Sequence, residues 1–432
     1  MAGLLRLALV LPLFAAAALS QPTLPQRIGF YQWVGELPAD AGSDLLTEAR
    51  HRSVAVGARV FRLYVGARFD YVHPPYSSRR FSQDGIKEPL TPARIVQIPR
   101  YRDVLADPHI ETVILTVYPI SDYGGGPDDL NLQRPWSDRE RDLEFTQTSE
   151  LCRRLYEQFG ALDKTVIIAN SEADEKLLDI MNYTGSPEMA IENIRRWTET
   201  RFDALRGARE AHPSARLRIL HAFEISLVNL RIVKQSRGFG KVPLPEPTEQ
   251  RRSWNALNDV VPHVSFDLLS YSAYESANSP FQTRQPDIDP AATGARLERD
   301  LNLIRSKARN SVSPSGREAF ADRFVMVGEV GYSRDRFEHL STGGVLPRLK
   351  HALQAAIDWG CPYIVLWQVF DHARDGDAAW GFGMHDREGE APPLKHSTGE
   401  CTSMQSCLQG LLLEGLGLGK RPNNGLGERP NK

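Results

Sequence analysis

The sequence has few cysteines, no internal repeat and no excess of charge of either sign. Four cysteines among 432 residues are too few for a disulfide scaffold, so the fold must depend on a hydrophobic core. Lys and Arg total 52 against 54 Asp and Glu, which excludes the broad basic field that binds nucleic acid or anionic membranes. No later apolar run is long enough to cross a bilayer. This composition favours an uncharged partner.

The N-terminus has the pattern of a secretory signal peptide. A short, positively charged start precedes an apolar run that ends in a small-x-small cleavage pattern at Ser20. We expect residues 1–20 to be removed on export, which predicts a secreted or periplasmic protein; an uncleaved anchor is the alternative. Residues 21–414 are expected to form the folded domain. Residues 415–432 are rich in Gly, Asn and Pro and are expected to be a disordered tail.

The four cysteines fall into two groups. Cys401 and Cys407 are close enough in sequence to close a small disulfide loop. Cys152 lies in a helical pattern and Cys361 just before an apolar strand, where we expect buried free thiols.

Apolar strand-like runs alternate with helical patterns along the chain. The expected strands are 27–33, 60–65, 112–118, 165–169, 217–223, 264–271, 324–330 and 363–370. Between them lie amphipathic windows such as 297–308, and Ser186-Pro187 supplies an N-cap and a first-turn proline. Continuous apolar strands indicate burial on both faces. The pattern predicts an α/β fold, a single (β/α)8 TIM barrel; an open doubly wound sheet is the alternative.

Several segments after the expected strands are long and rich in Pro, Gly and Asp. Examples are 121–137, after the third strand, and 232–252, after the fifth. Barrel enzymes build their sites from such βα loops at the C-terminal ends of the strands. We therefore expect the chemically active side chains at those strand ends.

Two carboxylates follow buried strands. Glu329 lies at the end of the seventh expected strand, and Glu172 follows the fourth. Strands four and seven are far enough apart around the ring for these side chains to face each other across the barrel mouth. Such a pair can cleave a glycosidic bond, because one acid protonates the leaving oxygen while the other carboxylate attacks the anomeric carbon.

With Arg62 on the second strand and Trp367 on the eighth, these glutamates resemble the retaining, clan A (cellulase-like) glycoside hydrolases with a TIM-barrel fold. The resemblance spans residues 27 to about 395. It implies hydrolysis of a β-linked glycan by double displacement, with Glu329 as nucleophile and Glu172 as acid/base. It also implies that Arg62 hydrogen-bonds the nucleophile and that Trp367 forms the floor under the reacting sugar.

Two further residues enter through the same resemblance. Tyr274 looks like the hydroxyl that touches the nucleophile, and Tyr271 is the competing assignment. Asn170 is the candidate for binding the sugar, although the group has Asn directly before the acid/base and here Ser171 intervenes. If the strand stays extended, Asn170 and Glu172 share one side and both point into the mouth.

The two glutamates should differ in proton affinity. Glu329, supported by Arg62, is expected to have a low pKa, whereas Glu172 is expected to have a raised one.

Each main candidate also has a structural alternative: an ion pair for Glu329, a helix-start carboxylate for Glu172, a local ion pair for Arg62 and core packing for Trp367. His221 and Glu224, on the fifth strand, are weaker candidates, because a single barrel histidine is more often structural.

Other functions match the sequence less well. A metal-dependent barrel hydrolase would have His-x-His on the first strand, a dinucleotide site would have GxGxxG before a helix, and a serine hydrolase would have GxSxG; none occurs. The alternative of another class is a non-catalytic carbohydrate-binding protein on a glycosidase-like barrel. We expect a monomer that binds an oligo- or polysaccharide and needs no metal or cofactor.

Overall fold

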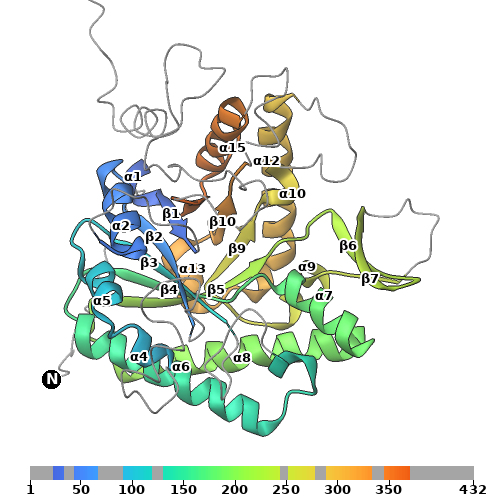
Figure 1. Cartoon of the computed structure of the whole chain (residues 1–432), viewed down its shortest axis with the longest axis horizontal. Coiled ribbons are helices and arrows are strands. Elements are labelled where there is room, and N and C mark those ends of the chain that lie inside the picture. Colours follow the sequence, from blue (N-terminus) through green and yellow to red (C-terminus); the bar gives the residue numbers. More distant parts are fainter. Residues whose placement is uncertain are drawn as a thin grey trace, which may run out of the picture.

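Eight parallel strands close into a barrel. The computed structural model describes residues 23–33, 43–66, 91–118, 130–243, 252–277, 289–332 and 345–369. The barrel strands are β1 (Ile28–Gln32), β2 (Val60–Val65), β3 (Thr112–Val117), β4 (Thr165–Ala169), β5 (Arg218–Ile225), β9 (Leu268–Ser272), β10 (Val325–Val330) and β11 (Ile364–Trp367). They pair in chain order, and β11 returns to β1 (Figure 1). The predicted (β/α)8 barrel is confirmed, and the doubly wound alternative is wrong.

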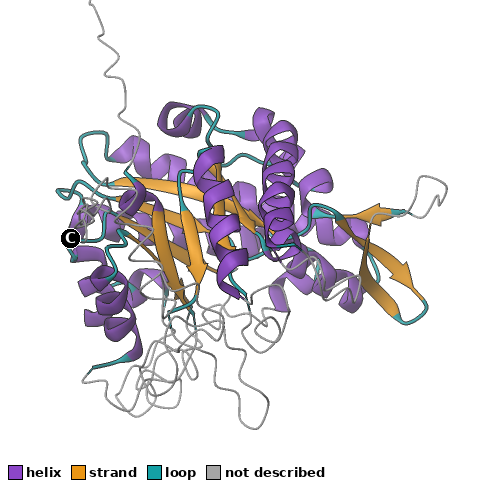
Figure 2. Cartoon of the chain, turned by 90° about the horizontal axis from the view of Figure 1, so that it is seen from above, coloured by secondary structure: helices purple, strands orange, loops and turns teal. Residues whose placement is uncertain are grey.

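Helices surround the barrel (Figure 2). Those before β5 are α1 (Leu24–Arg27), α2 (Leu45–Ala55), α4 (Pro92–Ile95), α5 (Pro99–Ala106), α6 (Asp138–Phe159), α7 (Ala173–Thr184) and α8 (Pro187–Ala211). Those after it are α9 (Ala256–Asp259), α10 (Tyr274–Ala277), α12 (Pro290–Ala308), α13 (Pro314–Phe320) and α15 (Val345–Trp359). The window 297–308 lies in α12, and Ser186 caps α8 by accepting from the Met189 amide at 3.2 Å, both as predicted.

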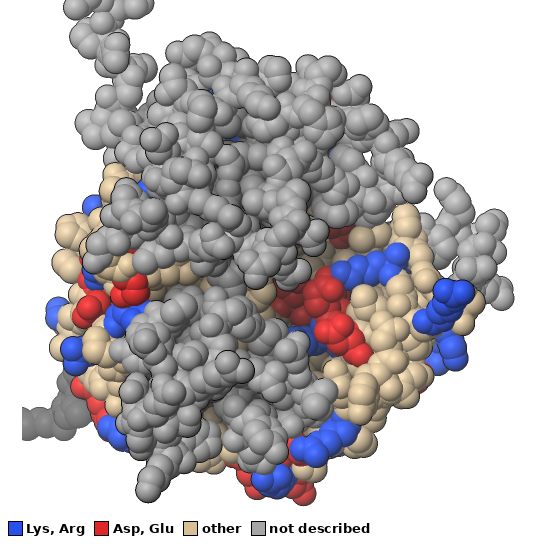
Figure 3. Space-filling view, viewed as in Figure 1, with Lys and Arg blue, Asp and Glu red and all other residues tan. Residues whose placement is uncertain are grey.

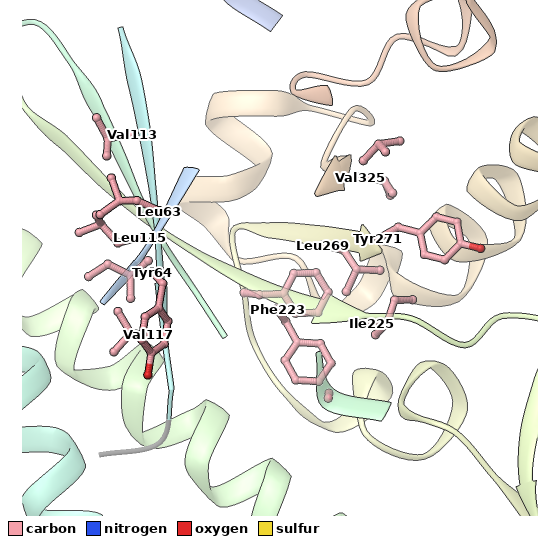
Figure 4. Packing of buried hydrophobic residues seen from close by; sticks show 14 of the residues in the cluster. Leu63, Tyr64, Val113, Leu115, Val117, Phe223, Ile225, Leu269, Tyr271 and Val325 are labelled. Carbon is pink, nitrogen blue, oxygen red and sulfur yellow. The ribbon is translucent and has the colours of Figure 1, made fainter. Parts of the chain in front are cut away.

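Side chains alternate between the inside of the barrel and the helix layer, because successive residues of a strand point to opposite sides. The apolar cluster inside the barrel includes Ile114, Ile167, Leu220, Leu268 and Met326. The larger cluster between strands and helices includes Leu63, Val113, Leu115, Phe223 and Leu269 (Figure 4). Toward the C-terminal strand ends the inner positions become polar, so the packed interior forms the floor of a polar site.

A three-stranded antiparallel sheet follows β5 and was not predicted. It consists of β6 (Leu230–Gln235), β7 (Gly238–Pro243) and β8 (Ser253–Trp254), and it extends from one side of the barrel (Figure 1). The segment 232–252, which was expected to be a βα loop, therefore contains strand residues over 232–235 and 238–243, and residues 244–251 lie outside the described part of the chain. Gly238, with φ of +121°, follows the turn between β6 and β7. The Asn182 side chain of α7 accepts from the Phe239 amide at 2.7 Å.

Two carboxylates fix the segment that follows β5. Asp174 of α7 accepts from the backbone N–H groups of Ser226, Leu227 and Ala256 at 2.8, 3.0 and 2.7 Å. Glu275 of α10 accepts from the next two amides of the same segment at 2.6 and 2.8 Å. The chain leaving the fifth barrel strand is thus bonded to two helices, which fixes the strand end from which the site is built.

Several sequence predictions fall outside the described residues: the signal peptide over 1–20, the tail over 415–432 and the pairing of Cys401 with Cys407. Cys152 and Cys361 are free and buried, as expected. Among the helices described, none is long and apolar enough to cross a membrane.

Replacing Asp174 with alanine should destabilise the protein, because three buried backbone N–H groups would lose their acceptor. We expect the free energy of unfolding to fall by about 2–4 kcal/mol, measured by chemical denaturation. Asp203→Ala is the matched control, since Asp203 is an exposed residue of α8 whose ion pair is with Arg206, three residues later, at 2.9 Å. Equal losses in the two variants would contradict the anchoring role of Asp174.

Candidate active site

A buried arginine lies at the centre of the polar layer inside the barrel. Arg62 of β2 is 1% exposed and spans the barrel to Glu224 of β5, which is not a neighbouring strand. The pair is bidentate, with Nη1 2.7 Å from Oε2 and Nη2 2.9 Å from Oε1 of Glu224. Arg62 Nε donates to Thr116 at 2.8 Å, and Nη1 also donates to the Gly328 carbonyl at 3.0 Å. The guanidinium therefore bonds to β3, β5 and β10.

Glu329 lies beside this Arg62–Glu224 pair. Its Oε1 is 3.3 Å from Arg62 Nη1, and the Ser272 hydroxyl donates to its Oε2 at 3.3 Å. Tyr274, the first residue of α10, also hydrogen-bonds its carboxylate. The competing residue Tyr271 is directed elsewhere, since its hydroxyl bonds with Ser276 at 2.7 Å.

Glu172 approaches the same place from the other side. It is the N-cap residue of α7, but its side chain makes no capping hydrogen bond. Instead it hydrogen-bonds with Ser272, the residue that also contacts Glu329. Because both carboxyl groups contact one hydroxyl, and Glu329 is the charge that raises the pKa of Glu172 most, the two groups lie close to each other. Glu172 and Glu329, the glutamate pair below, therefore face each other across Ser272.

Both members of the glutamate pair bind protons more tightly than an ordinary glutamate. Burial, and then the charge of Glu329, raise the pKa of Glu172 well above its usual range. Burial raises the pKa of Glu329 to about 8, although Arg62 acts in the opposite direction. The predicted low pKa of Glu329 is therefore wrong, because burial outweighs the effect of Arg62, which is bonded mainly to Glu224. The order of the two is as predicted: a single shared proton favours Glu172, because no cation among the described residues acts on it as Arg62 acts on Glu329.

Aromatic rings line the site next to Arg62. Trp367, at the end of β11, is partly exposed and lies 4.9 Å from the Tyr31 ring and 5.5 Å from the Trp33 ring, centroid to centroid. The Arg62 guanidinium is 4.4 Å from the centroid of Tyr31. A partly exposed indole of this kind can stack on an apolar sugar face.

Asn170 lies outside this cluster. Its side chain is fully buried against the helix layer, where Oδ1 accepts from Arg201 at 2.8 Å and lies 3.2 Å from His221 Nε2. The chain leaves β4 after Ala169, so the extended alternation that was expected to align Asn170 with Glu172 does not continue. Burial and then Arg201 lower the pKa of His221, which is a neutral structural residue here.

Glu224 is the site residue that sequence reasoning undervalued. It lies on β5 two residues after Ala222 and four after Leu220, both of which are inside the barrel. That parity alone places a carboxylate inside the barrel, where Arg62 of β2 is also directed. The Ser270 hydroxyl donates to it at 2.6 Å.

Acidic side chains, with Lys or Arg beside them, gather near the middle of the face shown in Figure 3, toward β6 and β7.

Metal ligation has no clear candidate in the part of the chain that the structure describes, where no group of three or more His, Cys, Asp or Glu side chains is arranged around a common point. The paired carboxylates supply the chemistry directly: one can act as an acid while the other acts as a nucleophile or base.

No family model matches the chain, and no curated protein sequence matches it. Among solved structures, the chain is similar to a GH5-4 broad specificity endoglucanase from Ruminococcus flavefaciens, at 14% identity and a TM-score of 0.48, over 91% of this chain and 99% of that one. It is also similar to an exo-beta-1,4-mannosidase from Opitutaceae bacterium strain TAV5, at 13% identity and 0.49, over 91% of this chain and 60% of that one. The similarity is too distant to transfer an activity or a substrate.

Replacing Glu172 with glutamine should stabilise the protein. A carboxyl group with a raised pKa lowers the stability of the folded state; the cost is greatest above that raised pKa and disappears only as pH falls below the ordinary value of 4.5, where the group is protonated in both states. We expect a gain on the order of 1 kcal/mol or more at alkaline pH that shrinks in acid, measured by denaturation across pH. Glu210→Gln, at an exposed position on α8, is the control. A loss of stability at alkaline pH would contradict the argument.

Proposed function

We propose that this chain is an exported, retaining glycoside hydrolase that cleaves a β-linked oligo- or polysaccharide, with Glu329 as nucleophile and Glu172 as acid/base. The observation that supports it most directly is the meeting of these two carboxyl groups at the Ser272 hydroxyl. Neither a metal ion nor a cofactor has a part in the proposed reaction.

The location of the shared proton supports the assignment of roles. Arg62, Ser272 and Tyr274 all stabilise negative charge on Glu329. Glu172 has the Ser272 hydroxyl but is surrounded by the charges of other carboxylates. The proton of the pair therefore belongs on Glu172, which is the state needed to protonate a leaving oxygen while ionised Glu329 attacks the anomeric carbon.

The spacing supports retention of configuration. Retaining enzymes have carboxyl groups about 5–5.5 Å apart, whereas inverting enzymes need about 6.5–9.5 Å to admit a water molecule. Two carboxylates within reach of one serine hydroxyl fit the closer class. After glycosyl-enzyme formation, Glu172 would be a base that activates the incoming water.

Substrate contacts are proposed for the residues next to the glutamate pair. Trp367 is proposed as the floor under the reacting sugar, and Tyr274 as the hydroxyl that orients the nucleophile. Ser171 directly precedes Glu172, and its buried hydroxyl has no hydrogen-bond partner among the described residues. We therefore assign to Ser171, in place of Asn170, the polar contact with the sugar beside the acid/base.

The glutamate pair can be tested by single amide substitutions on a panel of aryl β-glycosides and β-linked polysaccharides. Glu329→Gln should lower kcat by at least about 10³-fold, and Glu172→Gln by about 10²–10⁴-fold, with binding of the same glycan retained in both. Nuclear magnetic resonance of the first product should show the β anomer. A wild-type protein that binds glycans and hydrolyses none of them would favour the non-catalytic alternative, and an α product would overturn retention.

The pH dependence of the reaction follows from the two pKa shifts. Protonation of Glu329 removes the nucleophile, so kcat/KM should fall as pH drops through its pKa of about 8. It should fall again at higher pH, where Glu172 loses its proton. We therefore expect an alkaline optimum in a profile measured at constant ionic strength. An acidic limb at the ordinary glutamate pKa, near 4.5, would contradict this charge arrangement.

A further inference from the structure

The Arg62–Glu224 pair occupies the floor of the proposed catalytic centre, yet double displacement at an anomeric carbon requires only two carboxylates. Glu224 is fully buried and is bonded through both its oxygens to Arg62. Burial of a third carboxylate beside two others is costly unless it has a specific partner. We therefore expect Glu224 to have a function within the site.

We propose that Glu224 is a positioning residue of this centre, which fixes Arg62 against the strand of the nucleophile and takes up most of its charge. The proposal rests on the glycosidase function proposed above. Two bonds of 2.7 and 2.9 Å join Arg62 to Glu224, whereas a single 3.3 Å approach joins it to Glu329. Bidentate pairs of this kind dominate the interaction of a guanidinium.

The packing around Gly328 fixes where Arg62 can lie. The carbonyl of Gly328, directly before Glu329, accepts from Arg62 Nη1 at 3.0 Å. A methyl group at Gly328 would lie 2.7 Å from Glu224 Oε2 and 3.2 Å from Arg62 Nη1, and it would clash with the Ser270 hydroxyl. The absence of a side chain at Gly328 therefore allows the pair to pack directly under the backbone that presents the nucleophile.

This placement has a consequence for Glu329. The charged and titratable groups that face it among the described residues are Arg62, Glu224, Glu172, Tyr274 and Tyr31, on five different elements. Only one of these is a cation, and its charge is largely compensated by Glu224. A carboxylate that is incompletely neutralised is more basic and therefore a stronger nucleophile. Glu224 thereby acts on Glu329 through Arg62.

The test is Glu224→Gln, which frees the charge of Arg62 for Glu329. The acidic limb of the kcat/KM profile should move to lower pH by about one unit or more, and kcat should fall because the nucleophile is less basic. The control is Glu144→Gln, which breaks a second fully buried pair, Arg201–Glu144, located between α6 and α8. That variant should lose stability and leave the limb unchanged. An unmoved limb in Glu224→Gln, or an equal shift in both variants, would overturn the proposal.

A second variant separates charge from geometry and does not depend on the folding of the first. Glu224→Asp keeps the negative charge but is too short for the same bidentate contact, so kcat should fall by about 10- to 100-fold while the limb stays in place. Unchanged kcat in this variant would overturn the positioning role.

A substrate-free measurement distinguishes this inference from the proposed function. Infrared difference spectra against Glu329→Gln, recorded across pH, report the titration of Glu329 itself, with and without the Glu224→Gln change. A shift to lower pH in a protein that hydrolyses no glycoside would refute the glycosidase function and leave the charge relation intact. An unshifted titration in an active enzyme would refute the role of Glu224 alone.

Discussion

The site depends on one buried cation at the end of a closed barrel. A guanidinium stays charged at any physiological pH, so Arg62 must find partners for its donors inside the protein. Arg62 itself lies on β2, and its hydrogen-bond partners lie on β3, β5 and β10. A barrel achieves this because its inner positions converge from all sides, and a flat sheet would leave the same side chains in separate rows. The geometry of the glutamate pair depends on this buried arginine and its partners.

The same cation explains why the centre is both reactive and costly. Glu224 and Glu329 both contact one guanidinium, and the closer of them, Glu224, largely compensates its charge, which leaves Glu329 and Glu172 with little neutralisation. The remaining two then share a proton, since adjacent buried carboxylates do not both ionise readily. An unequal pair is what acid/base chemistry requires, and the repulsion within it lowers the stability of the fold. The repulsion between Glu172 and Glu329 therefore favours reactivity and lowers stability.

The fold could be predicted from the sequence because the barrel strands are predominantly apolar runs, such as 112–117 and 165–169, which are buried throughout. The convergence of Glu172 and Glu329 could be predicted because Glu172 follows such a strand and Glu329 lies at the end of one. The sheet of β6, β7 and β8 could not, since its short strands are rich in Gly and Lys and depend on tertiary contacts such as that of Asn182 with Phe239.

The electrostatics could not be predicted, because they depend on which carboxylate Arg62 selects. From the sequence Glu329 was the natural partner, being the candidate nucleophile. Arg62 bonds to Glu224 because these two side chains reach each other across the barrel, and the periodicity of the sequence does not give that distance. Strand parity does give one usable signal: a charged residue in phase with inward Leu220 and Ala222 must lie inside, and a buried charge needs a partner of opposite sign.

The junction between β4 and α7 shows how a short stretch separates chemical from structural roles. The strand ends at Ala169. The Asn170 side chain points away from the site, and its Oδ1 accepts a hydrogen bond from Arg201. Glu172 then begins the helix without capping it, which leaves its carboxyl group available to meet Ser272. Asp174, in the first turn of the helix, accepts hydrogen bonds from three backbone N–H groups of the neighbouring segments. Because Asp174 performs the anchoring, Glu172 needs no structural bond of its own and is free to exchange a proton.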